Sequence, residues 1–236
     1  GEHPPVSRAR WTTIERELRR TGGALIAGVD EVGRGSLAGP VVACAIVMPP
    51  DSRALRGVDD SKMLTPLARE RLVSQIMERA VTLGIGAASA REIDRINIYH
   101  ASTLAMRRAL SRLTVSPDHV LIDGRPIRSL GVEHRGIVDG DDKCFSIACA
   151  SIVAKVTRDR LMANLARRHP HYAWGDNCGY ATRRHIDALQ AHGSCAHHRQ
   201  SFVVKALIPG GMVLEIIESS DAHHIETEPT GDELLL

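Results

Sequence analysis

Aromatic residues are scarce in this sequence, at 3% of its 236 positions. A hydrophobic core must therefore come mainly from Ala, Val, Ile and Leu. Apolar runs long enough to cross a bilayer, which takes about 20 residues, are absent as well. The opening residues GEHPPVSRARW contain no apolar stretch of the kind found in secretory signals. We therefore expect a cytoplasmic protein without a membrane partner.

Cysteine pairs are also missing. The five cysteines form no CxxC motif and are odd in number. A disulfide framework uses an even set, and a Cys-rich zinc site uses closely spaced pairs. Neither is expected here, and the cysteine usage favours a reducing cytoplasm.

Positive charge disappears near the end of the chain: no Lys or Arg follows Lys205, whereas seven acidic residues do. Without those seven, residues 1–205 carry 30 basic and 21 acidic side chains, a net charge of +9. Such a basic body suits a polyanionic partner such as nucleic acid, although many basic proteins bind none. The acidic stretch 211–236 has the composition of a disordered tail, and we expect it to add nothing to the core.

Short apolar runs and helical patterns alternate along the rest of the chain. Strands are predicted at 24–30, 41–48, 81–89, 119–123 and 132–138. Helices are predicted at 6–20, 66–80, 90–113, 145–168 and 181–193. Adjacent strands come first, and strands alternate with helices later. This order predicts an α/β fold around a mixed sheet.

Acidic side chains stand at the ends of two predicted strands. Asp30 and Glu31 follow one apolar run and Asp123 ends another, while Asp141 follows Gly140 just before a long predicted helix. Strand ends of an α/β sheet can converge on one crevice, where carboxylates repel one another unless cations lie between them. Oxygen ligands without His or Cys indicate Mg²⁺ or Mn²⁺. The alternative is that these acids belong to ordinary solvated surface.

The neighbouring acids Asp30 and Glu31 raise a question of geometry. Successive residues of a strand point to opposite faces, so only one of the two can enter a given face. We expect the strand to end or twist at this point, or Glu31 to offer its backbone carbonyl to a metal.

Two glycines follow these acids in the sequence Gly33-Arg34-Gly35, and residues 33–38 match the dinucleotide fingerprint G-x-G-x-x-A. That fingerprint needs a helix after the glycines, but here a Gly-Pro pair leads into another predicted strand. A P-loop is excluded too, because no Gly-Lys-Ser/Thr follows. What remains is either a simple tight turn or a turn whose backbone a phosphate or sugar can approach closely, since glycine has no Cβ.

Six segments, taken together in order and spacing, resemble the ribonuclease HII family, the type 2 ribonucleases H of bacteria. They run from about residue 24 to 203 and read GVDEVGRGSLAGPVVACAIV, DDSKMLT, LIDGRP, DGDDKCFSIACASIVAKVTRDRLM, GYATRRHIDAL and HRQSF. The resemblance implies a ribonuclease H-like mixed five-stranded sheet flanked by helices, with a helical C-terminal part. With it we expect an N-terminal basic extension at 1–23, a catalytic domain at 24–210 and the tail at 211–236.

The resemblance further implies four catalytic, metal-binding carboxylates: Asp30, Glu31, Asp123 and Asp141, with Asp142 as a rival for the fourth place. The implied reaction hydrolyses the RNA strand of RNA–DNA hybrids and incises duplex DNA at embedded ribonucleotides. Two Mg²⁺ or Mn²⁺ ions would serve an in-line displacement that leaves 3′-hydroxyl and 5′-phosphate ends. We expect the protein to act as a monomer.

Substrate contacts are implied by the same resemblance. The backbone of Gly33, Arg34 and Gly35 would read the ribose 2′-hydroxyl, the group that separates RNA from DNA. Tyr180 would stack at the junction between a ribonucleotide and a deoxyribonucleotide, unless it is a half-buried core residue. Lys62 would contact a phosphate, although a surface lysine would look the same.

A few further positions bear on the substrate channel. Ser151 and Lys155 stand four residues apart, hence on one helix face, and would line the channel. Cys178 occupies a place where the family usually has a basic residue, which puts one substrate contact in question. The pair His197-His198 has no third ligand at a suitable spacing and is interpreted as structural or phosphate-facing.

Two other functions stay open at this stage. One is a non-catalytic nucleic-acid-binding module on the same fold, for which clustered acids would be a disadvantage because they repel phosphate. The other is a type 3 ribonuclease H, which cleaves hybrids but resists single ribonucleotides. That family carries a sizeable extra N-terminal domain, and about 23 residues precede the first predicted strand here.

Overall fold

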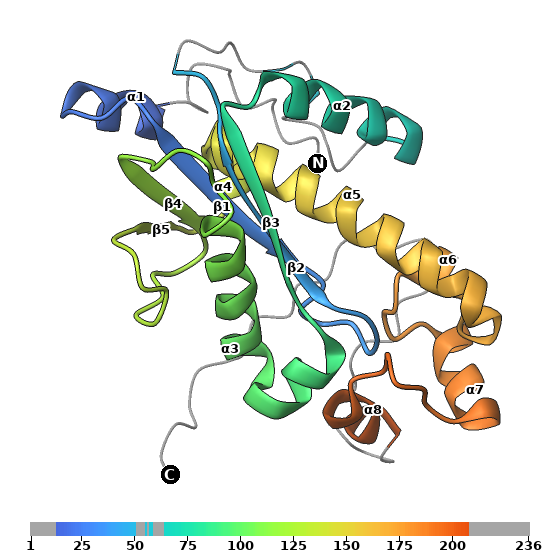
Figure 1. Cartoon of the computed structure of the whole chain (residues 1–236). Coiled ribbons are helices and arrows are strands. Elements are labelled where there is room, and N and C mark those ends of the chain that lie inside the picture. The colour runs from blue at the N-terminus through green and yellow to red at the C-terminus, as the bar shows by residue number, and fades with distance from the viewer. Residues whose placement is uncertain (1–12, 51–54, 56, 59–63, 208–236) are drawn as a thin grey trace, which may run out of the picture.

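The computed structural model describes residues 13–50, 55, 57–58 and 64–207. Its centre is a mixed sheet of five strands in the order β3-β2-β1-β4-β5 (Figure 1). The strands are β1 Ile26–Val32, β2 Val41–Val47, β3 Thr82–Ala88, β4 His119–Asp123 and β5 Arg135–Ile137. Strands β1, β2 and β3 are antiparallel neighbours, whereas β1, β4 and β5 run parallel. The predicted mixed five-stranded sheet is confirmed.

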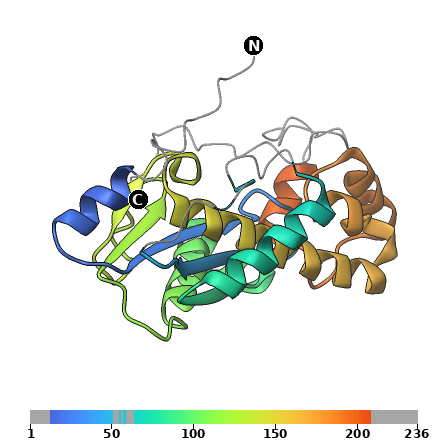
Figure 2. The same ribbon diagram turned by 90° about the horizontal axis from the view of Figure 1, so that it is seen from above.

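Helices cover both faces of this sheet (Figure 2). The three long ones are α2 Pro66–Arg79, α3 Ala90–Leu110 and α5 Phe145–Arg168. Side chains of β2 alternate between the two faces. Cys44 and Ile46 pack in a cluster with α2 and α5, whereas Ala43 and Ala45 pack with α3. Because both faces are covered, every residue of β2 is buried.

Helix starts follow the capping chemistry of the sequence. The Thr65 hydroxyl accepts a hydrogen bond from the backbone N–H of Ala68 (3.3 Å), and proline opens α2. Ser89 and Glu92 form a reciprocal capping box at the start of α3. The predicted boundaries 119–123 and 145–168 agree with β4 and α5 residue for residue.

Helix α3 contains a kink that the sequence pattern does not reveal. Asn97 has φ 62° and ψ 170°, a backbone region that is rarely occupied by residues other than glycine. The side chain of Asn97 accepts a hydrogen bond from the backbone N–H of His100 (3.1 Å). It thereby caps the second part of α3, and the first part, Ala90 to Ile96, becomes a short segment with its own direction.

Strand β1 runs straight through the two acids. Asp30 pairs with Cys44 and Glu31 with Ala43, and the ladder continues to Val32. The expectation that the strand ends at this pair is therefore wrong. Strand alternation is kept, so the Asp30 and Glu31 side chains leave the sheet on opposite faces.

The C-terminal part is helical, as expected. It consists of η2 Pro170–Tyr172, α6 Trp174–Asn177, α7 Arg183–His192 and α8 Gln200–Leu207. A separate apolar cluster, which includes Trp174, Leu189 and Val203, joins these helices to Leu37 in the turn after β1. Helix α8 was not predicted. Across the described residues, no helix combines the length and hydrophobicity that a membrane span requires.

The N-terminal helix α1, Thr13–Arg20, is tied to the same core; the first half of the predicted helix 6–20 lies outside the described residues. Ile14 and Leu18 pack against the cluster that contains Ile26 and Ile147. The Glu15 side chain is 2% exposed, and its Oε1 accepts a hydrogen bond from the backbone N–H of Ser146 (2.9 Å). A carboxylate of α1 thus satisfies one of the free donors in the first turn of α5.

We expect Glu15→Ala to lower the free energy of unfolding by about 1–3 kcal/mol, because it leaves a buried N–H group of α5 without its partner. Glu17→Ala, on the exposed side of α1, should change it by no more than about 0.5 kcal/mol. Urea unfolding followed by circular dichroism measures both. Equal effects of the two substitutions would contradict the capping role of Glu15.

Candidate active site

The carboxylates of β1 and β4 meet because these strands are parallel neighbours. The ladder pairs Val29 with Ile122, so the next residues along each strand are Asp30 and Asp123. Side chains at paired positions of neighbouring strands point to the same face, with the strands about 4.8 Å apart. Asp141 approaches from the short helix α4, Gly140–Lys143, which follows β5.

The electrostatics of Asp30 show which charges lie close to it. Burial raises the pKa of the Asp30 carboxyl well above its usual range, and the charges of Asp123, Glu31 and Asp141 raise it further. A hydrogen bond from the Ser151 side chain opposes this shift. Five of the predicted site residues, from β1, β4, α4 and α5, are therefore brought together. The rival Asp142 is exposed and is not among the charges that act on Asp30.

Each of three carboxylates also has a partner of its own. Oδ1 of Asp123 accepts a hydrogen bond from the backbone N–H of Gly140 (2.6 Å), and Oδ1 of Asp30 accepts one from the N–H of Glu31 (2.7 Å). Oε1 of Glu31 lies 2.9 Å from the Arg34 guanidinium. Among the described residues, no three His, Cys, Asp or Glu side chains lie close enough together to coordinate a metal ion in their present positions. The donor set, all oxygen and of one charge, is nevertheless the kind that suits a hard divalent cation.

The glycines of the turn after β1 have different structural reasons. Gly33 has φ +87°, and a Cβ on it would overlap the side chain of Arg158. Gly33 is therefore required by the fold itself. Gly35 has neither constraint, because its φ lies outside the left-handed region and a Cβ on it would meet nothing within 4 Å. Nothing in the described part of the protein explains a glycine at position 35.

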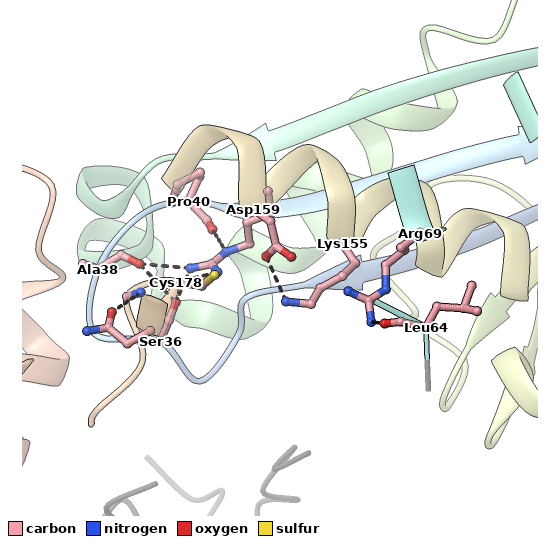
Figure 3. Close-up of polar contacts among 11 residues, drawn as sticks. Ser36, Ala38, Pro40, Leu64, Arg69, Lys155, Asp159 and Cys178 are labelled. Atoms are coloured by element: carbon pink, nitrogen blue, oxygen red, sulfur yellow. Dashed lines mark hydrogen bonds and ion pairs between the residues drawn. The ribbon is translucent and has the colours of Figure 1, made fainter. Parts of the chain in front are cut away.

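A buried arginine of α5 holds one side of this turn (Figure 3). Arg158 is 0% exposed. Its guanidinium donates to the carbonyls of Pro40 (2.9 Å) and Ala38 (3.1 Å) and to the hydroxyl of Ser36 (2.6 Å). It also donates to the carbonyl of Cys178 (2.9 Å), and so connects the turn to the C-terminal helices.

A second buried arginine holds the other side. Arg199, also 0% exposed, donates to the carbonyls of Gly33 (2.5 Å), Arg34 (2.6 Å) and Gly39 (3.1 Å). Burial lowers the pKa of Arg199 well below its usual range, and the neighbouring charge of Arg158 lowers it further. The two guanidinium groups form what we call the arginine clamp, Arg158 and Arg199.

Sequence reasoning missed the arginine clamp. One signal was available for Arg158: the positions one helical turn away on either side, Ala154 and Met162, are apolar, which places the arginine on a buried face. For Arg199 no comparable pattern exists, because it precedes α8 and its partners lie about 160 residues earlier in the chain.

The predicted channel residues lie beside the clamp. The Arg158 guanidinium stands 5.6 Å from the ring centre of the half-buried Tyr180. Lys155 forms an ion pair with Asp159 (2.8 Å), one turn further along α5 (Figure 3). The Cys178 side chain hydrogen-bonds to Asp159, and burial is the main cause that raises the pKa of the Cys178 thiol to about 11.

The other predicted residues are placed as follows. Arg34 is held at Glu31 and exposes 44% of its side chain. Lys62 lies outside the described residues.

Two buried histidines, His185 and His198, hold the backbone carbonyl of Tyr180 in place. The backbone N–H of Cys195 donates to Nδ1 of His198 (3.0 Å). Because Nδ1 of His198 is an acceptor, its ring proton is on Nε2, which donates to Nε2 of His185 (3.0 Å). Trp174 donates to the same His185 nitrogen (3.1 Å), and Nδ1–H of His185 donates to the carbonyl of Tyr180 (2.8 Å). Every ring nitrogen is used with both rings neutral, so His198 is structural.

A family model described as ribonuclease HII matches residues 27–205. The chain belongs to the ribonuclease HII family. The ribonuclease HII of Granulibacter bethesdensis is 51% identical over 201 residues, covering 84% of this chain and 92% of that protein. That of Thermosynechococcus vestitus is 50% identical over 197 residues, covering 83% and 91%. The crystal structure of the Pyrococcus horikoshii ribonuclease H2 matches with a TM-score of 0.66 at 27% identity, over 77% of this chain and 96% of that one.

Family membership makes this protein a ribonuclease H: a hydrolase and endonuclease that acts on RNA–DNA hybrids. The matched span contains the four carboxylates, the turn after β1, Tyr180 and both arginines of the clamp. The enzyme's candidate active site therefore lies wholly inside the region that defines the family.

The histidine pair gives this ribonuclease HII a predictable acid sensitivity. Burial, before all other causes, lowers the pKa of His185 and lowers that of His198 to about 4, from 6.5 in an unfolded chain. Between these pH values the unfolded chain binds more protons than the folded one, so stability falls as the pH drops from 6.5 towards 4. We expect His198→Gln, which keeps a donor at the Nε2 position, to flatten this decline. Unfolding free energies of both proteins across that range measure it, and parallel curves would contradict the assignment.

Proposed function

We propose that this enzyme cuts the RNA strand of RNA–DNA hybrids and also incises duplex DNA at single ribonucleotides, using two divalent ions, Mg²⁺ or Mn²⁺. Asp30, Asp123 and Asp141 hold the ions by their carboxylates, and Glu31, whose side chain leaves the sheet on the other face, contributes its backbone carbonyl. The observation that carries this proposal is the buried Asp30 carboxyl, whose pKa three other carboxylates raise. A fold that gathers like charges at such cost needs a cation to offset them.

Bound between these carboxylates, the ions would polarise the phosphate, activate water and stabilise the leaving 3′ oxygen. The protein's own part is to orient its oxygens. Gly140 N–H fixes one oxygen of Asp123, and the Ser151 hydrogen bond restrains Asp30. Water attacks phosphorus directly and the 3′ oxygen leaves, so the products carry 3′-hydroxyl and 5′-phosphate ends without a covalent enzyme intermediate.

Selection of the ribonucleotide falls to the turn after β1. The open space beside Gly35 leaves its backbone accessible to a ribose 2′-hydroxyl, and the flanking Gly33 and Arg34 complete the reader. Tyr180 stacks on the sugar or base at the junction, with its ring backed by Arg158. Lys62 supplies positive charge for a phosphate, and Ser151 and Lys155 line the channel.

A binding module without catalysis is the weaker candidate. Phosphate contacts alone gain nothing from four acids at the centre of the site, since these repel the nucleic acid backbone. A type 3 enzyme would leave a lone ribonucleotide uncut, so that substrate separates the two types.

Asp123→Asn should reduce cleavage about a thousandfold or more, because metal-assisted chemistry is worth several kcal/mol. The fold should persist, since the asparagine oxygen can still accept the Gly140 hydrogen bond. The control is Asp142→Asn at the exposed neighbour of Asp141, which should keep near-normal activity. The assay compares an RNA–DNA hybrid, a duplex with one ribonucleotide and plain DNA, each with Mg²⁺ and with Mn²⁺. Full activity of Asp123→Asn would overturn the metal assignment.

Gly35→Ala should leave stability within about 0.5 kcal/mol of the wild type, because its Cβ points into open space. Cleavage at a single ribonucleotide should nevertheless fall at least about tenfold, corresponding to about 1.4 kcal/mol of lost transition-state binding, and further in Gly35→Val. Gly175→Ala in α6 is the matched control, since its Cβ makes only ordinary contact. Unchanged turnover in both Gly35 variants would refute the reading of the 2′-hydroxyl.

A further inference from the structure

Helix α8 begins with a residue that cannot cap it. The Arg199 carbonyl accepts from the backbone N–H groups of Phe202 (3.0 Å) and Val203 (2.9 Å), which makes Arg199 the N-cap residue. An N-cap side chain normally accepts a hydrogen bond from the first turn. An arginine has donors only, and this one is directed into the turn after β1 instead.

Asp94, in the first part of α3, supplies the missing acceptors from 106 residues earlier in the chain. Figure 1 shows the first part of α3 beside α8. Its Oδ2 accepts from the backbone N–H of Gln200 (2.9 Å). Its Oδ1 accepts from the backbone N–H (3.0 Å) and the hydroxyl (2.7 Å) of Ser201. The free donors at the start of α8 are thus satisfied by one carboxylate on another helix.

The charge of Asp94 also reaches the arginine. Arg199 is buried, and its guanidinium donates to the carbonyl groups of Gly33, Arg34 and Gly39 rather than to a carboxylate. The negative charge of Asp94 supports the protonated Arg199. Burial acts to raise the Asp94 pKa, but the hydrogen bonds from Ser201 and Gln200 outweigh it, so that the pKa is lowered and the carboxylate stays ionised.

We propose that Asp94 is a positioning residue for the turn that reads the ribonucleotide, acting through the start of α8 and Arg199. The line of contacts runs from Asp94 to the N-terminus of α8, from there to the Arg199 guanidinium, and on to the carbonyls of Gly33 and Gly39. The kink at Asn97 gives the segment that carries Asp94 a direction of its own. This inference has a mechanical side, that Asp94 holds the turn in place, and a substrate side, that the turn held in this way reads the ribonucleotide. Only the substrate side rests on the proposed function.

The mechanical side is tested without substrate, by hydrogen exchange of the backbone amides of Leu37, Ala38 and Gly39. Asp94→Ala should speed their exchange about tenfold, as expected for the loss of about 1.4 kcal/mol of local restraint. Asp94→Asn, which keeps one acceptor but removes the charge, should give a smaller increase and serves if the alanine variant folds poorly.

The matched control is Thr82→Val. Thr82 accepts two hydrogen bonds from Thr114 at the start of β3, the end of the sheet away from the turn. Thr82→Val should leave the exchange rates of the three amides within about twofold of those of the wild-type protein. Unchanged exchange in both Asp94 variants, or equal acceleration in Thr82→Val, would overturn the inference.

The substrate side is tested by kinetics on a duplex with one ribonucleotide. Asp94→Asn should raise KM about fivefold to tenfold with kcat within about twofold, while Thr82→Val changes neither. An unchanged KM would refute the link to substrate. If the wild-type enzyme does not cut this duplex, the proposed function fails, and the exchange measurements still decide whether Asp94 holds the turn.

Discussion

Two positive charges buried among backbone carbonyls support this active site. Arg158 and Arg199 are both fully buried, and they donate to the carbonyls of residues 33, 34, 38, 39 and 40. A guanidinium has five donors in a fixed planar fork, so each arginine dictates the direction of several peptide groups at once. A lysine offers no such plane. The turn after β1 is therefore shaped by side chains that come from α5 and from the residue before α8.

The opposite sign of charge gathers at the end of β1, directly before this turn. Asp30 and Asp123 share a face because β1 and β4 are parallel neighbours in register, and Asp141 joins them from α4. The same strand β1 thus leads from a negative cluster into a turn held by cations. Glu31 and Arg34 connect the two regions through their ion pair. Metal binding and substrate selection are adjacent because they are consecutive in sequence.

Local features were predictable and distant ones were not. The boundaries of α5 and β4 followed from apolar runs with clear ends. The choice of Asp141 over Asp142 as a metal ligand stays a prediction, and of the two only the charge of Asp141 acts on Asp30. The arginine clamp, α8 and the kink at Asn97 escaped sequence reasoning. Their causes are contacts between segments up to 166 residues apart, or a strained backbone conformation that no residue pattern predicts. That β1 continues through Asp30 and Glu31 could be recognised only from its pairing with β2.

The position of Arg199 along the chain has a consequence for biosynthesis. Strands β1 and β2 leave the ribosome early, but the carbonyls of Gly33 and Gly39 gain their guanidinium partner only when residue 199 has been added. A nascent chain that lacks this residue has only the Arg158 half of the arginine clamp, together with the backbone hydrogen bonds from Leu37 and Ala38 to Gly179. The reading turn is thus completed by one of the last elements to be translated in the described fold, and a truncated chain is left without it.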